Sequence, residues 1–215
     1  MKIVVPIMPK NLEAIEQLSS DQYQGADLIE WRADFLAISD LELAARKIKD
    51  KFPDHPIIFT FRTEDKDEQL LSDADYARLI DKFASEFAYI DIEVLRFPKA
   101  SIPQNAIASY HDFDQIPENL PEILGKMQAR HPKVVKCAGM PQDKKDVIRL
   151  MSETLTFSEV HPDQIIVTMA MGELGKVTRL VGDSFGSSWT FAAVDATSAP
   201  GQLSLTEMRQ LQHIL

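Results

Sequence analysis

The chain has 215 residues, a formal net charge of −10 and one cysteine. This acidity argues against nucleic acid and acidic membrane surfaces as partners, and one cysteine cannot form an internal disulfide. No stretch approaches the length of a transmembrane helix, and the apolar run at the N-terminus is too short for a signal peptide. We therefore expect a soluble protein of the cytoplasm, with residues 1–215 forming one domain.

Eight apolar, strand-like runs follow one another along the chain at fairly regular spacing. Most of them are hydrophobic almost throughout, as is typical of strands in a parallel sheet that is covered on both faces. The runs are Ile3–Ile7, Leu28–Arg32, Ile57–Arg62, Tyr89–Glu93, Ala106–Tyr110, Val134–Ala138, Ile165–Ala170 and Trp189–Val194.

Segments with helical periodicity and polar faces lie between these runs. They include Asn11–Ser19, Leu41–Lys51, Asp73–Phe87, Glu118–Arg130, Lys144–Leu155 and Leu205–Leu215. Ser72, followed by Asp75, predicts an N-cap for the third of these helices, and Pro141 is placed to open the fifth.

The alternation of strands and helices predicts a compact (β/α)₈ TIM barrel. An open doubly wound sheet is the alternative, but no glycine-rich dinucleotide fingerprint follows the first strand. The connection Val94–Asn105 contains two prolines and is too short for a full helix. We therefore expect a shortened fourth helix.

Polar residues gather at the carboxyl ends of the predicted strands, where the functional site of such a barrel lies. From the second strand to the sixth, these residues are Glu30 and Arg32, Arg62, Asp91 and Glu93, Ser109 and His111, and Lys136. Five successive strands with charged or titratable groups at one end indicate a site rather than packing.

Lys136 lies in the middle of an apolar run. Burial disfavours the charged form of an ammonium group, and a neutral amine is the nucleophile that forms a Schiff base with a carbonyl. A lysine that extends from a strand end to solvent is the common alternative. The neighbouring Cys137 should point the other way, into the layer between barrel and helices, where it would serve packing.

The five histidines separate by position. His55, His131 and His161 each precede a proline just before a strand, which places them at the opposite end of the barrel, and His213 lies in the terminal helix. Only His111 leaves the carboxyl end of a strand. Because the pKa of histidine lies near neutral pH, His111 is suited to move a proton beside the amine of Lys136.

Arg32, Arg62 and Arg179 are placed at or after strand ends. A cationic site in an anionic protein indicates a small anionic substrate, with the guanidinium groups binding a carboxylate or a phosphate. Surface ion pairing is the alternative for each of them. No His/Cys cluster has metal-ligand spacing, so we expect neither a metal nor another cofactor.

From the first strand to the last helix, the chain resembles the type I 3-dehydroquinate dehydratases, the Schiff-base-forming enzymes of the shikimate pathway. The matching stretches are Glu30–Asp34, Phe59–Arg62, Asp91–Glu93, Ser109–Phe113, Val135–Ala138, Met171–Arg179, Phe185–Ser187, Thr190–Phe191 and Ser198–Gln202. Their number, order and separations make a chance match implausible.

The resemblance implies a (β/α)₈ barrel, commonly a homodimer, and a role for each site residue. Lys136 would form an imine with the C3 ketone of 3-dehydroquinate. His111 would remove a proton from C2 and protonate the departing C1 hydroxyl, and Arg179 would hold the substrate carboxylate. The remaining substrate-binding residues would be Glu30, Arg32, Arg62, Ser198 and Gln202, the last two on a loop that closes over the site.

The chain departs from the family pattern after the third strand. Members of the family carry a glutamate and two glycines there, and the glutamate orients the catalytic histidine. Here Arg62 is followed by Thr-Glu-Asp-Lys-Asp-Glu-Gln without glycine. Glu64, Asp65, Asp67 or none of them orients His111. An N-terminal hairpin before the first strand is also missing.

Two other functions fit parts of the pattern. A class I aldolase acting on a sugar phosphate would use the same lysine chemistry, with a phosphate site near Gly182 and Gly186. A catalytically inactive relative that binds a small molecule would explain the altered loop after Arg62.

Overall fold

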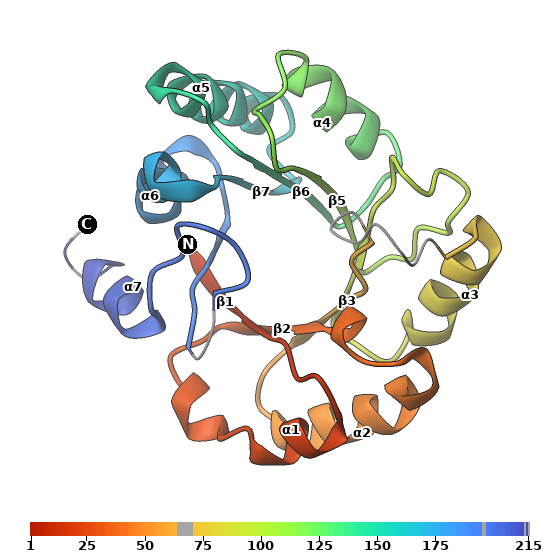
Figure 1. The fold of residues 1–215 in the computed structure, drawn as a ribbon. Coiled ribbons are helices and arrows are strands. Elements are labelled where there is room, and N and C mark those ends of the chain that lie inside the picture. Colours follow the sequence, from red (N-terminus) through yellow and green to blue (C-terminus); the bar gives the residue numbers. More distant parts are fainter. Residues whose placement is uncertain (64–70, 195–196, 213, 215) are drawn as a thin grey trace.

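The computed structural model describes residues 1–63, 71–194, 197–212 and 214. Eight parallel strands form one sheet in the order β7-β6-β5-β4-β3-β2-β1-β8, and Figure 1 shows this sheet curved into a barrel with the helices outside it. The amide of Ser188, just before β8, donates to the carbonyl of Ile166 in β7 at 2.7 Å, which joins the two ends of the sheet. The predicted (β/α)₈ barrel is confirmed.

All eight predicted strands are present, with boundaries that differ by a few residues. They are β1 Lys2–Ile7, β2 Leu28–Arg32, β3 Ile57–Thr60, β4 Tyr89–Ile92, β5 Ala106–Asp112, β6 Val134–Gly139, β7 Ile165–Ala170 and β8 Trp189–Phe191. Arg62 and Glu93 therefore lie just beyond the ends of β3 and β4.

The helices cover the outside of the barrel. They are α1 Leu12–Gln17, α2 Leu41–Lys51, α3 Asp73–Phe83, α4 Leu120–Gln128, α5 Lys144–Val160, α6 Gly172–Val181 and α7 Leu205–Gln212, with 3₁₀ turns at Ser20–Tyr23, Ala33–Phe35, Ile38–Asp40 and Gly182–Phe185. Helix α6 is present in the structure but was not among the helical segments named from the sequence. The connection Val94–Asn105 contains turns and no helix, so the predicted shortened fourth helix is wrong. No helix among the described residues is long and apolar enough to cross a membrane.

Side-chain caps decide where two helices begin. The hydroxyl of Ser72 accepts the amide of Asp75 at 3.2 Å, so the predicted cap of α3 is confirmed. The predicted start of α5 at Lys144 is also confirmed. Pro141 does not open this helix as expected, because the carboxylate of Asp143 accepts the amides of Lys145 and Asp146 and caps the helix two residues further on.

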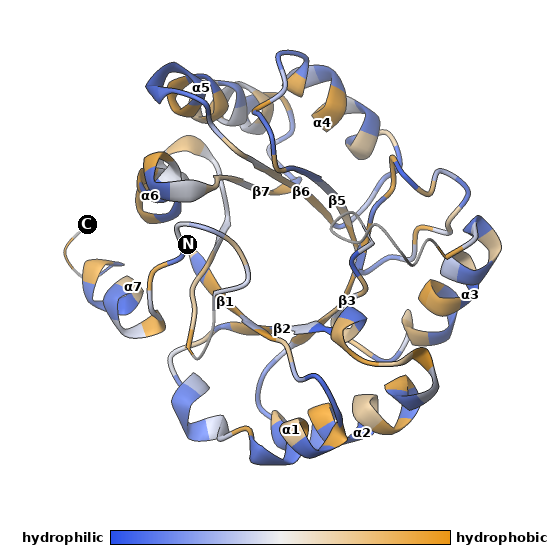
Figure 2. Cartoon of the chain, viewed as in Figure 1, coloured by the Kyte–Doolittle hydropathy of each residue, from blue (hydrophilic) through white to orange (hydrophobic). Residues whose placement is uncertain are grey.

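The core has two layers that follow the alternation of side chains along the strands. A larger cluster lies between strands and helices and includes Trp31, Phe59 and Cys137, as predicted for the cysteine. A smaller cluster fills the inside of the barrel, with Ile58 and Trp189 among its members. Figure 2 shows hydrophobic residues along the strands and on one side of several helices.

Helix α6 lies very close to the end of β7. A Cβ atom at Gly175 would stand 2.2 Å from the carbonyl oxygen of Ala170, and the hydroxyl of Thr178 accepts the amide of Ala170 at 3.0 Å. This close approach places Arg179 of α6 at the carboxyl ends of the strands.

Gly175→Ala should lower the free energy of unfolding by about 3 kcal/mol or more, because the added methyl group collides with backbone atoms that cannot rotate away. Gly125→Ala is the matched control, since a Cβ at Gly125 of α4 meets nothing within 4 Å. The control should raise the stability by about 0.5–1 kcal/mol. Urea unfolding measures both, and equal stabilities would contradict the packing described for α6.

Candidate active site

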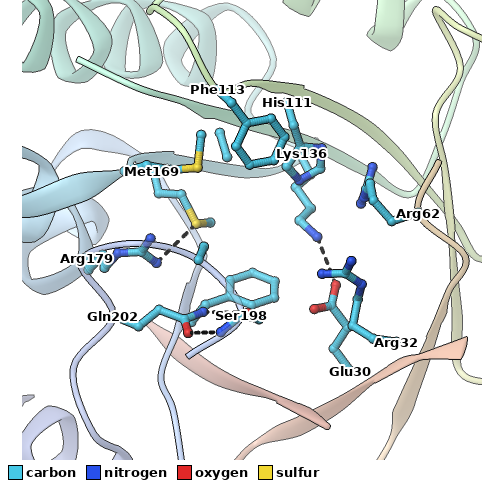
Figure 3. A pocket seen from close by; sticks show the side chains of 14 residues that line it. Glu30, Arg32, Arg62, His111, Phe113, Lys136, Met169, Arg179, Ser198 and Gln202 are labelled. Atoms are coloured by element: carbon cyan, nitrogen blue, oxygen red, sulfur yellow. Dashed lines mark hydrogen bonds and ion pairs between the residues drawn. The ribbon is translucent and has the colours of Figure 1, made fainter. Parts of the chain in front are cut away.

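A pocket opens at the carboxyl ends of the strands, and all eight predicted site residues line it (Figure 3). They are Glu30, Arg32, Arg62, His111, Lys136, Arg179, Ser198 and Gln202. The described part of the pocket wall also includes Phe113, Ala138, Met169, Met171, Phe191 and Ala199. None of these six was predicted as a site residue.

Lys136 projects into the barrel from β6 because its neighbours Val135 and Cys137 belong to the outer layer. The lysine is 4% exposed. Its Nζ lies 3.1 Å from Oε1 of Glu30 and 3.2 Å from Oδ2 of Asp91, and 4.7 Å from the ring centroid of Phe191. The predicted burial is therefore observed, and two carboxylates accompany it.

Arg62 continues this ion network on the other side of Asp91. Its Nη2 donates to Oδ1 of Asp91 at 2.9 Å, and its Nη1 donates to Glu93 and to Ser109 at 3.1 Å each. Burial would raise the pKa of Asp91, but the positive charges of Arg62 and Lys136 outweigh it and hold the pKa below its usual value. Asp91 is therefore ionised at neutral pH.

Arg32 is oriented by Asp34, two residues further along the chain. The two groups form a bidentate pair, with Nε to Oδ1 at 2.9 Å and Nη2 to Oδ2 at 3.0 Å. Burial lowers the pKa of Arg32, but the hydrogen bond and charge of Asp34 and the charge of Glu30 raise it overall. Glu30 in turn accepts the hydroxyl of Thr60 at 3.1 Å.

His111 extends from β5 into the same pocket, on the strand next to Lys136. Its ring stacks on Phe113 with centroids 6.4 Å apart. Desolvation, followed by the positive charges of Arg62, Lys136 and Arg32, lowers the pKa of His111 well below its usual value. The imidazole is therefore neutral at neutral pH and able to accept a proton.

Arg179 is a buried cation held by uncharged acceptors. Its Nη1 lies 3.4 Å from Sδ of Met169, and its Nη2 donates to the carbonyl of Pro200 at 3.2 Å. Burial lowers the pKa of Arg179 to about 10, so the group stays protonated at neutral pH. No carboxylate within the described ranges forms an ion pair with it, which leaves its charge available to an anionic ligand.

The loop that carries Ser198 and Gln202 follows β8. The side-chain Nε2 of Gln202 donates to the hydroxyl of Ser198 at 2.9 Å, and the backbone amide of Ser198 donates to Oε1 of Gln202 at 2.8 Å. Gly172 donates its amide to Pro200 at 3.1 Å. Gly201 has a φ of +78°, and a Cβ there would lie 2.2 Å from the oxygen of Gly172, so only glycine permits this contact.

Two pocket residues that the sequence analysis did not identify continue the alternation of side chains from residues that it did identify. Ala138 stands two residues after Lys136, and Phe113 stands two residues after His111. This spacing of two is the signal that could have identified them. The expectation about Glu64, Asp65 and Asp67 falls outside the described residues. Within the described ranges, no group of three His, Cys, Asp or Glu side chains could hold a metal ion.

Comparisons with known proteins show the family of the chain. The family model of type I 3-dehydroquinase matches residues 3–215. The 3-dehydroquinate dehydratase of Streptococcus equi subsp. zooepidemicus is 44% identical over 228 residues, covering 100% of this chain and 98% of that protein.

Two solved structures have the same fold. The 3-dehydroquinate dehydratase of Geobacillus kaustophilus gives a TM-score of 0.87 at 30% identity, covering 100% of this chain and 90% of that one. The type I 3-dehydroquinate dehydratase of Clostridium difficile, with covalent modified comenic acid, gives 0.85 at 32% identity, covering 99% of this chain and 91% of that one. The activity shared by the family and these relatives is that of a hydro-lyase, 3-dehydroquinate dehydratase. The chain belongs to the type I 3-dehydroquinase family.

Proposed function

We propose that the pocket dehydrates 3-dehydroquinate to 3-dehydroshikimate through an imine on Lys136. The observation that carries this proposal is the pairing of a buried lysine amine with the buried cation Arg179 in one pocket. The amine can react with the ketone of the substrate, and Arg179 can bind its carboxylate.

The covalent step begins when the ammonium group of Lys136 gives one proton to the neutral imidazole of His111 and the resulting amine attacks the ketone carbon; the imidazolium returns this proton to the departing ketone oxygen. A C–N bond forms, the ketone oxygen leaves as water, and the nitrogen ends as a protonated imine. Ammonium and ketone together thus give protonated imine and water, so charge and atoms balance. The positive nitrogen then withdraws electrons and acidifies the adjacent C–H group.

His111 would carry out the proton transfers. Its neutral imidazole takes the proton from C2, and the electron pair of that bond forms the new double bond while the hydroxyl leaves C1. The same proton, returned by the imidazolium, converts the leaving hydroxyl into water. Hydrolysis of the imine then releases 3-dehydroshikimate and restores the amine of Lys136.

The remaining residues would bind and enclose the substrate. Arg32, Arg62 and Glu30 lie at the end of the pocket where β2 and β3 terminate, and they would bind hydroxyl groups of the ring. Ser198 and Gln202 would cover the bound molecule, because their loop already rests on the first turn of α6. The described residues require no cofactor for these steps.

Lys136→Ala should lower turnover by on the order of 10⁴-fold or more while leaving the protein folded, because no other group at that position can form the imine. Lys133→Ala is the matched control, since Lys133 precedes β6 at the far end of the barrel and stacks on Tyr89 at 4.9 Å. Near-normal activity of Lys136→Ala would contradict the imine mechanism.

The pH dependence tests His111. Because its pKa lies well below the usual 6.5, its base form persists as the pH falls, and kcat/KM should stay level to below pH 6.5. His111→Ala should be about 10²–10⁴-fold slower. Its pH profile should also lack the fall in kcat/KM at low pH that protonation of His111 causes in the unaltered enzyme.

His111→Ala should still form a substrate adduct that borohydride reduces, because Lys136 is intact. An acidic limb centred at pH 6.5 or above in the unaltered enzyme, or failure of His111→Ala to form any adduct, would contradict the role given to His111.

We also propose that the enzyme is a cytoplasmic homodimer acting as one catalytic domain over residues 1–215. The resemblance of the chain to its family supports the dimer, and a single cysteine, buried in the outer core layer, suits a reducing compartment. Light scattering should give twice the 24.3 kDa mass of the chain. A mass of one chain at micromolar concentration would contradict the dimer.

A further inference from the structure

The two carboxylates that contact the amine of Lys136 differ in their surroundings. Glu30 lines the pocket and is within reach of a bound ligand. Asp91 is only 1% exposed and does not belong to the pocket wall. A ligand that enters the pocket can therefore compete for Glu30, whereas the contact between Asp91 and Lys136 is shielded from it.

Asp91 is also fixed in place by groups other than Lys136. Its Oδ1 accepts Nη2 of Arg62 at 2.9 Å and the hydroxyl of Ser109 at 2.6 Å, while Oδ2 faces Lys136 at 3.2 Å. Ser109 is the direct neighbour of Lys136 across β5 and β6. Rotation of the carboxylate away from Lys136 would break two further hydrogen bonds.

We propose that Asp91 is a further catalytic residue, the permanent counterion of the nitrogen of Lys136 before and after the imine forms. This inference rests on the imine mechanism proposed above. It assigns to Asp91 a task that Glu30 cannot perform while Glu30 binds the substrate.

The chemistry of the covalent step explains why one fixed counterion is sufficient. The ammonium group before imine formation and the protonated imine after it carry the same positive charge on the same nitrogen, so one fixed carboxylate is the counterion of both states. In a buried site this attraction is much stronger than in water. A protonated imine withdraws electrons far better than a neutral one, so a carboxylate that favours protonation speeds the removal of the C2 proton.

Other charged or titratable groups line the pocket or belong to the same ion network. They are Glu30 and Arg32 on β2, Arg62 after β3, Glu93 after β4, His111 on β5 and Arg179 on α6. Because these groups are the same in the unaltered enzyme and in a variant at Asp91, a difference in pH dependence between the two proteins reports on Asp91.

Asp91→Asn tests the inference, because asparagine keeps the size of the side chain and an oxygen acceptor but removes the charge. We expect kcat to fall about 10- to 100-fold, the usual effect of losing a charged hydrogen-bond partner. The matched control is Asp27→Asn, which removes a carboxylate that pairs with Arg209 at 2.7 Å at the amino end of β2. The control should keep normal turnover.

The decisive measurement is the rate at which cyanoborohydride, which reduces protonated imines selectively, traps the substrate adduct between pH 6 and pH 9. Relative to the unaltered enzyme, the rate for Asp91→Asn should fall steeply as the pH rises, because its imine loses the proton more readily. Asp91→Glu keeps the charge and should show the pH dependence of the unaltered enzyme at a lower kcat. It also replaces the asparagine variant if that protein does not fold.

Four results would count against the proposals. If Asp91→Asn stays within twofold of normal kcat, or is slow with an unchanged pH dependence of trapping, Asp91 is not the counterion. A steep pH dependence in Asp91→Glu would contradict the inference as well. If the unaltered enzyme forms no trapped adduct, the imine mechanism itself is wrong, which separates this failure from that of the inference.

Discussion

The ion network around Asp91 is the constraint on which the rest of the site depends. Two cations, Lys136 and Arg62, share this carboxylate, and Glu30 and Glu93 complete the network at the pocket and at the end of β4. Burying charges costs more than hydrophobic packing of the same volume, and a buried ion pair by itself is weak support for stability. A barrel that keeps five such groups in and beside its pocket therefore keeps them for chemistry, since they hold a reactive amine at a fixed position.

The parallel barrel provides what this network needs. Neighbouring strands place Ser109 beside Lys136 and Thr60 beside Asp91. Residues far apart in the sequence therefore meet, and Ser109 donates to Asp91 at 2.6 Å while Thr60 donates to Glu30 at 3.1 Å. Outside the network, Arg179 comes from a helix that packs against β7 without a side chain at Gly175. Its partners Met169 and Pro200 are uncharged, so the guanidinium is oriented while its charge remains for the substrate carboxylate. One end of the pocket thus surrounds the cations Lys136 and Arg62 with carboxylates, and the other end leaves the positive charge of Arg179 available to the ligand.

Alternation along strands is a local pattern, and this is why the sequence predicted the barrel and the meeting of Lys136 and His111 in one pocket. Contacts between distant segments were beyond its reach. Arg179 donates a hydrogen bond to the carbonyl of Pro200, which lies 21 residues further along the chain. No periodic pattern in the sequence indicates this contact. Helix α6 escaped prediction because Gly172 and Gly175 weaken its helical signal, although packing on β7 requires the second glycine. The start of α5 was predicted at the right residue but assigned to Pro141, whereas the side chain of Asp143 caps the helix.

The central claim is that Lys136 becomes covalently bound to the substrate. The most direct measurement is the intact mass of the enzyme after incubation with 3-dehydroquinate and borohydride, followed by peptide mapping. The account predicts one reduced substrate per chain, attached to the peptide that contains Lys136. Attachment to another lysine, or no attachment in a folded enzyme that turns over the substrate, would contradict it.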